Sequence, residues 1–322
     1  MKAEILSSRG ATPPHHRTYT WQGAFLKKLK DSKILLLMVL PTLLYFIIFH
    51  YLPMWGVLIS FKDFSIFKGF SESPWVGLKY FDLFFGNPNA WRLIRNTLLL
   101  SAYSILWGFP MPIIFALFLN EVRKEKAKKF VQTVSYMPHF ISTVVLVSMV
   151  TMFLSPSTGL LNNLRDLLGF ERIYFMGKSS YFRTIYIISG IWQSLGWSSI
   201  LYLAAISNID QQLYEAAVID GAGKLKQIIY VTIPCIAPTI ITLFLLNLGS
   251  IMNVGFEKAF LLQNPGIYDT ADVIQTFVYR QGIKQGNFSY ASAVGLFNSA
   301  INVTLLVISN LISKRLSQTS LW

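Results

Sequence analysis

Long apolar runs separated by shorter polar segments dominate the chain. A helix that crosses a bilayer needs roughly 20 predominantly apolar residues. Six runs are about that long, and they cover residues 34–60, 97–119, 136–154, 184–206, 236–256 and 291–313. The pattern predicts an all-α polytopic membrane protein with six transmembrane helices, whose membrane domain covers residues 34–313.

Composition supports the same class of protein. Of the 322 residues, 53% are hydrophobic and 13% are charged, whereas about a quarter are charged in soluble proteins. The net charge of +13 could suggest nucleic-acid binding, but the basic residues lie in short loops between apolar runs, so no nucleic-acid partner is expected. The single Cys235 excludes an intramolecular disulfide.

Lysine and arginine are distributed unevenly between the two sides of the predicted membrane domain. Dense basic clusters occur at residues 27–33 and 123–129, and cytoplasmic loops of membrane proteins carry such an excess. We therefore expect a basic cytoplasmic N-terminal segment at residues 1–33, a cytoplasmic loop at 207–234 and a cytoplasmic tail at 314–322. The predicted location is the cytoplasmic membrane.

The loop at residues 207–234 is a polar island between two apolar runs. Asp210 can cap a helix of about ten residues by accepting a backbone N–H. Leu213, Ala216 and Ala217 have the spacing of one buried helical face. Gly221 then ends this helix, and a short basic helix leads to Pro234. The pattern predicts a docking element.

Several residues of this loop carry a resemblance to the signature loop of ABC importer permease subunits: Glu215, Ala216, Ala217, Asp220, Gly221 and Ala222, followed by Ile233-Pro234. The resemblance implies the type I ABC importer transmembrane fold, in which a cytoplasmic coupling helix seats in a groove of the ATPase. Residues 132–142 and 255–265 are similar to permeases of the maltose-importer type, closest to those for oligosaccharides released from complex polysaccharides.

The resemblance also implies a set of partners. We expect a bacterial ATP-driven oligosaccharide importer with a second, different permease subunit, two ATPase subunits and an extracytoplasmic solute-binding protein. ATP and Mg²⁺ would bind the ATPase subunits, and this chain would bind no cofactor. Gly223-Lys224 does not open a phosphate-binding loop, because that motif requires glycine at Val218 and serine or threonine at Leu225.

Uncharged polar and aromatic residues recur at helical spacing within the last three runs, and they could line a sugar path or hold helices together by hydrogen bonds. The candidates for the path are Trp192, Gln193, Trp197, Asn247, Ser250, Asn253, Asn298 and Asn302. Amides offer donors and acceptors to sugar hydroxyls, and indoles cover sugar rings. The resemblance places cargo contacts near residues 253–257. Among the candidates for the sugar path, we rank Asn253 and Gln193 highest.

Charged residues point to the remaining candidates and exclusions. Glu257 and Lys258, just outside the fifth run, are candidates for an external gate. The surplus of basic over acidic residues on the external side is compatible with a uronate-containing sugar. The alternative function is an ion-coupled secondary carrier for a polar solute. None of the six runs contains Asp, Glu, Lys or Arg, which argues against such a carrier. No catalytic set or metal site is expected.

Overall fold

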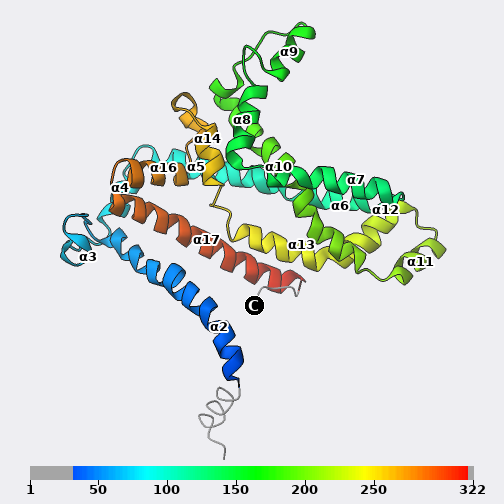
Figure 1. Ribbon diagram of the computed structural model, residues 1–322, viewed down its shortest axis with the longest axis horizontal. Coiled ribbons are helices and arrows are strands. Elements are labelled where there is room, and N and C mark those ends of the chain that lie inside the picture. The colour runs from blue at the N-terminus through cyan, green and yellow to red at the C-terminus, as the bar shows by residue number, and fades with distance from the viewer. Residues whose placement is uncertain (1–31, 318–322) are drawn as a thin grey trace, which may run out of the picture. The chain divides into compact units, whose positions relative to one another are not determined.

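The computed structural model describes residues 32–317, and the regular elements in that range are helices (Figure 1). The predictions made for residues 1–31 and 318–322 lie outside the described residues. The chain divides into two compact units, residues 1–56 and residues 57–322.

The first unit contains one apolar helix. It consists of α2 (Lys33–Phe46), the π-helical turn η1 (Ile47–Tyr51) and the start of the 3₁₀ helix η2 (Leu52–Phe61). The residues from Leu36 to Phe61 are long and apolar enough to cross a membrane, and large apolar side chains along them are exposed. A helix that is apolar on all sides suits a lipid environment or a partner helix, which agrees with the first predicted span.

Three further candidate spans lie in the second unit. The first comprises α5 (Ala90–Tyr103), the π-helical turn η3 (Ser104–Gly108) and α6 (Pro110–Asn120). The second comprises α12 (Lys224–Gln227), the π-helical turn η6 (Ile228–Thr232) and α13 (Ile233–Leu248), and the third lies in α17 (Phe288–Ser317). The turn η3 ends two residues before Pro110, whose ring lacks an N–H and disfavours regular helix geometry in the preceding turn.

The remaining two predicted spans do not match single candidate spans. The run at 136–154 falls on α7 (Glu125–Tyr136), the 3₁₀ turn η4 (Met137–Phe140) and α8 (Thr143–Phe153), and this helix pair bends by 100°. The run at 184–206 lies in α10 (Ser179–Ser207), which has 29 residues but is not a candidate span by composition. Among the described residues, four helices could cross a membrane, or five if the bent pair is one span, so the count of six is not confirmed.

The fifth predicted span was placed about ten residues too far along the chain. Its helix begins with α12 and ends at Leu248, and residues 249–255 are not helical. The N–H of Met252 donates to Oδ1 of Asn302 in α17 at 2.8 Å, so a side chain of another helix takes the bond that a longer α13 would have used. Hydropathy does not detect this end because residues 249–256 are mostly apolar or small.

Short helices make up the connections between the long ones. They are α3 (Gly69–Glu72), α4 (Lys79–Phe85), α9 (Leu160–Leu167), η5 (Phe175–Gly177), α14 (Phe256–Leu262), η7 (Pro265–Ile267), α15 (Tyr268–Ala271), α16 (Ile274–Tyr279) and η8 (Arg280–Lys284). An isolated antiparallel bridge joins Lys62 to Trp75. Buried Asp272 forms an ion pair with Arg280 at 2.6 Å beside α16.

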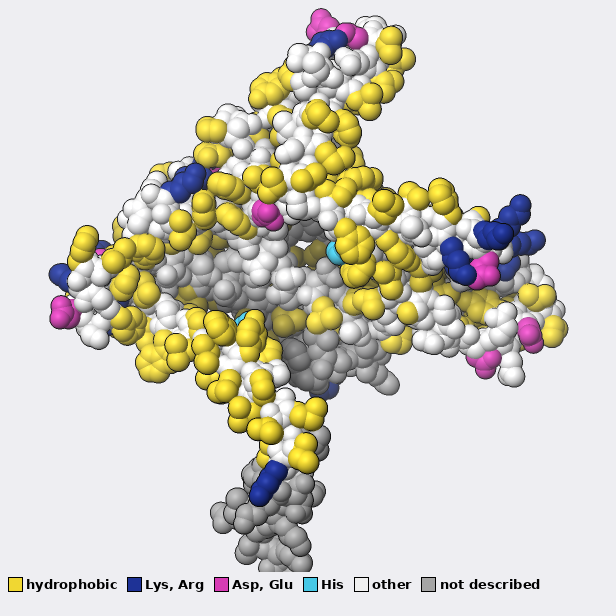
Figure 2. All heavy atoms as spheres, viewed as in Figure 1, with side chains coloured by type: hydrophobic (Ala, Val, Ile, Leu, Met, Phe, Trp, Pro, Cys, Tyr) yellow, Lys and Arg dark blue, Asp and Glu magenta, His cyan; other side chains and the backbone are white. Residues whose placement is uncertain are grey.

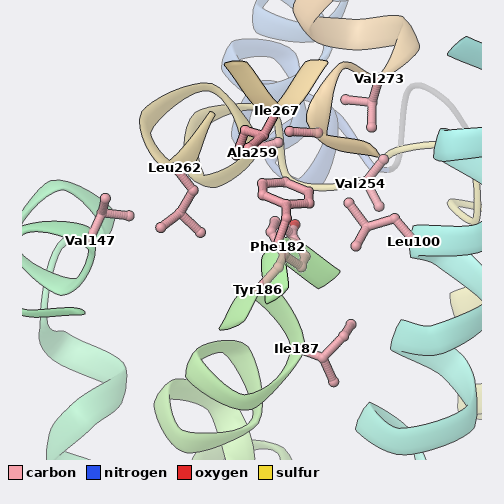
Figure 3. Packing of buried hydrophobic residues seen from close by; sticks show 11 residues of the cluster. Leu100, Val147, Phe182, Tyr186, Ile187, Val254, Ala259, Leu262, Ile267 and Val273 are labelled. Carbon is pink, nitrogen blue, oxygen red and sulfur yellow. The ribbon is translucent and has the colours of Figure 1, made fainter. Parts of the chain in front are cut away.

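Helix α10 packs against much of the second unit. Its Phe182 and Tyr186 insert between residues of α5, α8 and α14, among them Leu100, Val147 and Leu262 (Figure 3). A second cluster joins α10 to α6 and α13 through Tyr202 and its neighbours. Since apolar burial gives little net driving force between helices in lipid, their association depends on close packing and hydrogen bonds.

Gly196 permits the tightest of these approaches on α10. A Cβ at this position would collide with the backbone carbonyl of Ser135 in α7. At Gly295 in α17, by contrast, an added Cβ would meet no atom within 4 Å. Small residues at helix interfaces allow backbones to approach closely in membranes.

We predict that Gly196→Ala lowers the melting temperature of the purified complex, because overpacking a tight contact costs about 1–3 kcal/mol. The matched control Gly295→Ala should keep or raise the melting temperature, because alanine is the better helix former. Thermal melting followed by size-exclusion chromatography measures both. Equal melting temperatures for the two variants would show that the α10–α7 contact is not tight.

Candidate functional site

The loop after α10 forms a capped helix, α11 (Gln211–Ile219), as the sequence predicted. Oδ1 of Asp210 accepts the N–H of Gln212 at 2.9 Å. At the other end, the N–H of Ala222 donates to the Ala217 carbonyl at 2.8 Å, and Gly221 has a φ of 75°. This left-handed conformation closes a helix end without the steric cost that a side chain would add. Helix α11 is therefore fixed at both ends by local bonds.

The predicted buried face of α11 is not buried in this chain. Leu213 and Ala216 are exposed, Ala217 is half-buried and no residue of α11 is buried. Ile219 is 85% exposed, and Leu225 of the following helix is 70% exposed. The spacing identified an apolar face correctly, but this face has no partner within the described residues. Such a face is typical of an interaction surface.

A groove of about 720 Å³ runs beside α11. It is lined by Asn120, Glu121, Arg123, Gln211, Tyr214, Glu215, Val218, Ile219, Lys224 and Gln227. The hydroxyls of Tyr214 and Thr232 lie 2.9 Å apart and connect α11 to η6. Lys224 pairs with Glu121 at 3.5 Å, whereas exposed Glu215 makes no ion pair with any described residue. Basic side chains gather at this end of the second unit, over α7 and α12 (Figure 2).

A second cavity, which we call the α10 hollow, has a volume of about 740 Å³. Its lining comes from α10, η3, α6, α13 and α14: Ser104, Ile105, Gly108, Phe109, Pro112, Tyr186, Ile187, Gly190, Ile191, Gln193, Ser194, Trp197, Ser198, Ile200, Leu201, Tyr202, Leu243, Asn247 and Lys258. Three residues predicted to line a path, Gln193, Trp197 and Asn247, therefore meet in one cavity. Trp192, which is 45% exposed, is not among the lining residues.

Two of these residues also hold the bend between α7 and α8. Nε2 of Gln193 donates to the Ile141 carbonyl at 2.8 Å, in the break of the helix pair. The ring of Trp197 stacks on His139 with 4.4 Å between centroids and an interplanar angle of 1°. Asn247 donates only to the Leu243 carbonyl one turn earlier in its own helix. On the side of the bend, contacts with Ile141 and His139 therefore hold the lining residues Gln193 and Trp197 in place. On the side of α13, the amide of Asn247 bonds only within its own helix.

Ser250 and Asn253 lie beyond the end of α13, and Asn253 belongs to an amide cluster rather than to the hollow. Oδ1 of Asn253 accepts from Gln275 at 3.1 Å, from Asn298 at 3.1 Å and from Asn302 at 3.2 Å. Asn298 and Asn302 are buried. The cluster connects the segment after α13 to α16 and α17. A role of these amides in cargo contact stays a prediction.

The two residues predicted as an external gate occupy different environments. Glu257 is exposed, whereas Lys258 is buried and lines the α10 hollow. Nζ of Lys258 donates to the Tyr186 carbonyl at 2.6 Å and lies 4.5 Å from the centroid of the Tyr186 ring. Burial disfavours the charged form and lowers the pKa of Lys258 to about 7. Gly190 provides the room, because a Cβ there would lie 2.9 Å from this Nζ.

Sequence reasoning missed Lys258 as a hollow residue because it treated each apolar run as a separate span. It also missed Tyr186, Gly190 and Ser194. Tyr186, Gly190, Gln193 and Trp197 follow each other at intervals of four, three and four residues, which is the spacing of one helical face. That spacing could have identified the face of α10 that borders the hollow.

The chain is similar in sequence to known proteins. The chain is 46% identical to protein LplB of Bacillus subtilis over 303 residues, which are 94% of each chain. It is 44% identical, over 92% of each chain, to the polygalacturonan/rhamnogalacturonan transport system permease protein YteP of the same organism.

A solved structure is also similar. The crystal structure of a bacterial ABC transporter involved in the import of the acidic polysaccharide alginate contains a chain that matches with a TM-score of 0.86 and 43% identity. The match covers 91% of this chain and 99% of that one. Residues 108–318 match the family described as binding-protein-dependent transport system inner membrane components. These matches confirm the resemblance found in the loop around Glu215, and the chain belongs to that family of transporter permeases.

Proposed function

We propose that the chain is one of two permease subunits of an ATP-driven oligosaccharide importer in the bacterial cytoplasmic membrane. Family membership supports a membrane component that works with a binding protein, and the relatives' names support a sugar cargo. The single observation that carries the coupling role is α11, which is capped at both ends, lacks buried residues and projects the carboxylate of Glu215, which makes no ion pair with any described residue. ATP and Mg²⁺ would bind partner ATPase subunits.

Helix α11 would be the surface that seats in the ATPase. Its exposed apolar residues Val218 and Ile219 would lose contact with water on docking, and Glu215 would meet a basic side chain of the ATPase. The caps keep α11 a rigid helix, so it can transmit a displacement instead of unwinding. Asp220, Gly221 and Ala222 close this helix, while Ala216 and Ala217 keep its face small.

The chain connections suggest how a displacement of α11 would reach the cargo path. Helix α11 follows α10 after residues 208–210 and is tied to η6 by the Tyr214–Thr232 bond, so both helices that flank it would move. Both α10 and α13 line the hollow, and Gln193 extends the connection to the bend between α7 and α8. ATP would shift the equilibrium between two states by its differential affinity for them.

The α10 hollow would form this subunit's share of the sugar path, completed by the second permease. A sugar that leaves water needs replacement hydrogen bonds, because an unpaired polar group in an apolar setting costs on the order of several kcal/mol. Gln193 and Asn247 supply amide groups, and Trp197 supplies an aromatic face. Neutral groups suit a path in which binding must stay weak enough for release.

The proposed topology has six spans, with α10 and the bent α7–α8 pair each crossing the membrane. Both termini and residues 207–234 would face the cytoplasm, where the ATPase subunits lie, and a solute-binding protein would deliver cargo to the opposite face. The basic side chains near α7 and α12 support this orientation.

We predict that Glu215→Lys abolishes ATP-driven uptake, because the reversed charge would repel a basic partner on the ATPase. The variant subunit should still insert and assemble with the second permease, since Glu215 makes no ion pair with a described residue. Glu72→Lys, an equal charge change at another exposed carboxylate, is the control and should transport normally. Uptake by vesicles loaded with ATP measures both variants. Normal transport by Glu215→Lys would remove Glu215 from the coupling surface.

A cysteine-labelling experiment tests the orientation. In a Cys235→Ala background, we expect a cysteine at Lys226 to be inaccessible to an impermeant thiol reagent added outside intact cells. A cysteine at Leu167, which is 84% exposed near the end of α9, should react. Labelling of the Lys226 position from outside would reverse the proposed topology.

Asn247 and Asn302 give a matched pair that separates a path role from a structural role. Asn247→Leu removes an amide that bonds only within its own helix, so it should lower uptake while assembly persists. Asn302→Leu removes the bonds to Met252 and Asn253, so it should lower the yield of assembled complex. Uptake normalised to complex yield distinguishes the effects. Unchanged uptake by Asn247→Leu would show that the hollow does not contact cargo.

A further inference from the structure

Lys258 is buried, although its side chain can carry a positive charge. The residue is 8% exposed, and it forms no ion pair with any residue between 32 and 317. Its Nζ has three N–H donors, of which one bonds to the Tyr186 carbonyl. A buried charge of this kind is costly unless an opposite charge or a polar partner offsets it.

The position of Lys258 makes the hollow the place where such a partner would bind. Lys258 is the charged residue in the lining of this cavity, and Gly190 leaves the space that the ammonium group occupies. A cation with unused donors at the surface of a cavity favours an anionic ligand. The lowered pKa of Lys258 has the same origin, because burial penalises the charge and a bound anion would favour it.

The other groups that line the hollow favour an anion that is part of a sugar. Gln193, Ser194 and Asn247 supply uncharged hydrogen-bonding groups, and Trp197 supplies an indole. A small inorganic anion would not need an aromatic surface, whereas a uronate unit presents a carboxylate, several hydroxyls and an apolar ring face. The chemistry of the cavity therefore matches an acidic sugar better than a free ion.

We propose that Lys258 binds the carboxylate of a uronate unit in the α10 hollow, so that this subunit carries acidic oligosaccharides. The inference rests on the proposed function and names the substrate class of the same path. A lysine suits this role because its compact ammonium is a point charge without the two-pronged grip of arginine. The carboxylate would be attracted to the hollow and still be able to leave it.

Thiol protection in the assembled complex, held in nanodiscs without binding protein, tests the site directly. In a Cys235→Ala background, Ser194→Cys places a reporter in the hollow on an exposed position of α10. The ligands are a galacturonate trisaccharide and the same trisaccharide with its carboxyls reduced to alcohols. We expect the acidic sugar to slow labelling by a neutral thiol reagent and the reduced sugar to slow it much less.

Variants assign this preference to Lys258. Lys258→Met should raise the half-protecting concentration of the acidic sugar by about tenfold or more and leave that of the reduced sugar unchanged. Lys258→Arg should retain the preference for the acidic sugar. Lys284→Met, which removes an exposed charge outside the hollow, is the control and should behave as the unaltered complex.

Two results would overturn the inference: equal protection by both sugars in the unaltered complex, or an unchanged preference in Lys258→Met. ATP-driven uptake by the same complex separates this failure from failure of the proposed function. If the complex takes up the reduced sugar but not the acidic one, the chain is part of an importer with a neutral cargo, and only the inference about Lys258 fails. Absence of ATP-driven uptake of either sugar, with binding protein added, would contradict the importer itself.

Discussion

The hydrogen bond from Gln193 to the Ile141 carbonyl marks the constraint that organises the second unit. In an apolar environment a break in a helix leaves backbone groups that water cannot satisfy, so another part of the protein must supply partners. Helix α10 does so at the bend between α7 and α8, and it reaches that bend because Gly196 allows close approach to Ser135. Polar residues of α10, among them Gln193, Ser194 and Ser198, border the hollow.

The same helix connects the two candidate sites. Residues 208–210 join one end of α10 to the capped helix α11, and the middle of α10 lines the cavity that contains Lys258. A displacement at the docking surface would therefore reach the hollow through this three-residue connection and through packed side chains. The bond between Tyr214 and Thr232 adds a second route into α13. Such rigid connections allow a local docking event to bias two arrangements of a membrane subunit.

Local rules predicted α11 well. An Asp before the helix and a Gly after it act through bonds to near neighbours, so Asp210 and Gly221 could be placed from the sequence alone. Contacts between distant segments could not be placed this way. The end of α13 depends on a bond from Met252 to Asn302, fifty residues later, and the environment of Lys258 depends on Tyr186 and Gly190 in another helix. Hydropathy also gave no sign that α11 would leave its apolar face uncovered.

We infer that this chain transmits the state of a sugar-loaded binding protein to a separate ATPase. The most direct measurement is ATP hydrolysis by the reconstituted complex with binding protein, with and without oligosaccharide. We expect sugar-loaded binding protein to stimulate hydrolysis only when the ATPase subunits are assembled with this chain and its partner permease. If a fully assembled complex hydrolyses ATP at the same rate with and without loaded binding protein, this chain does not transmit that signal.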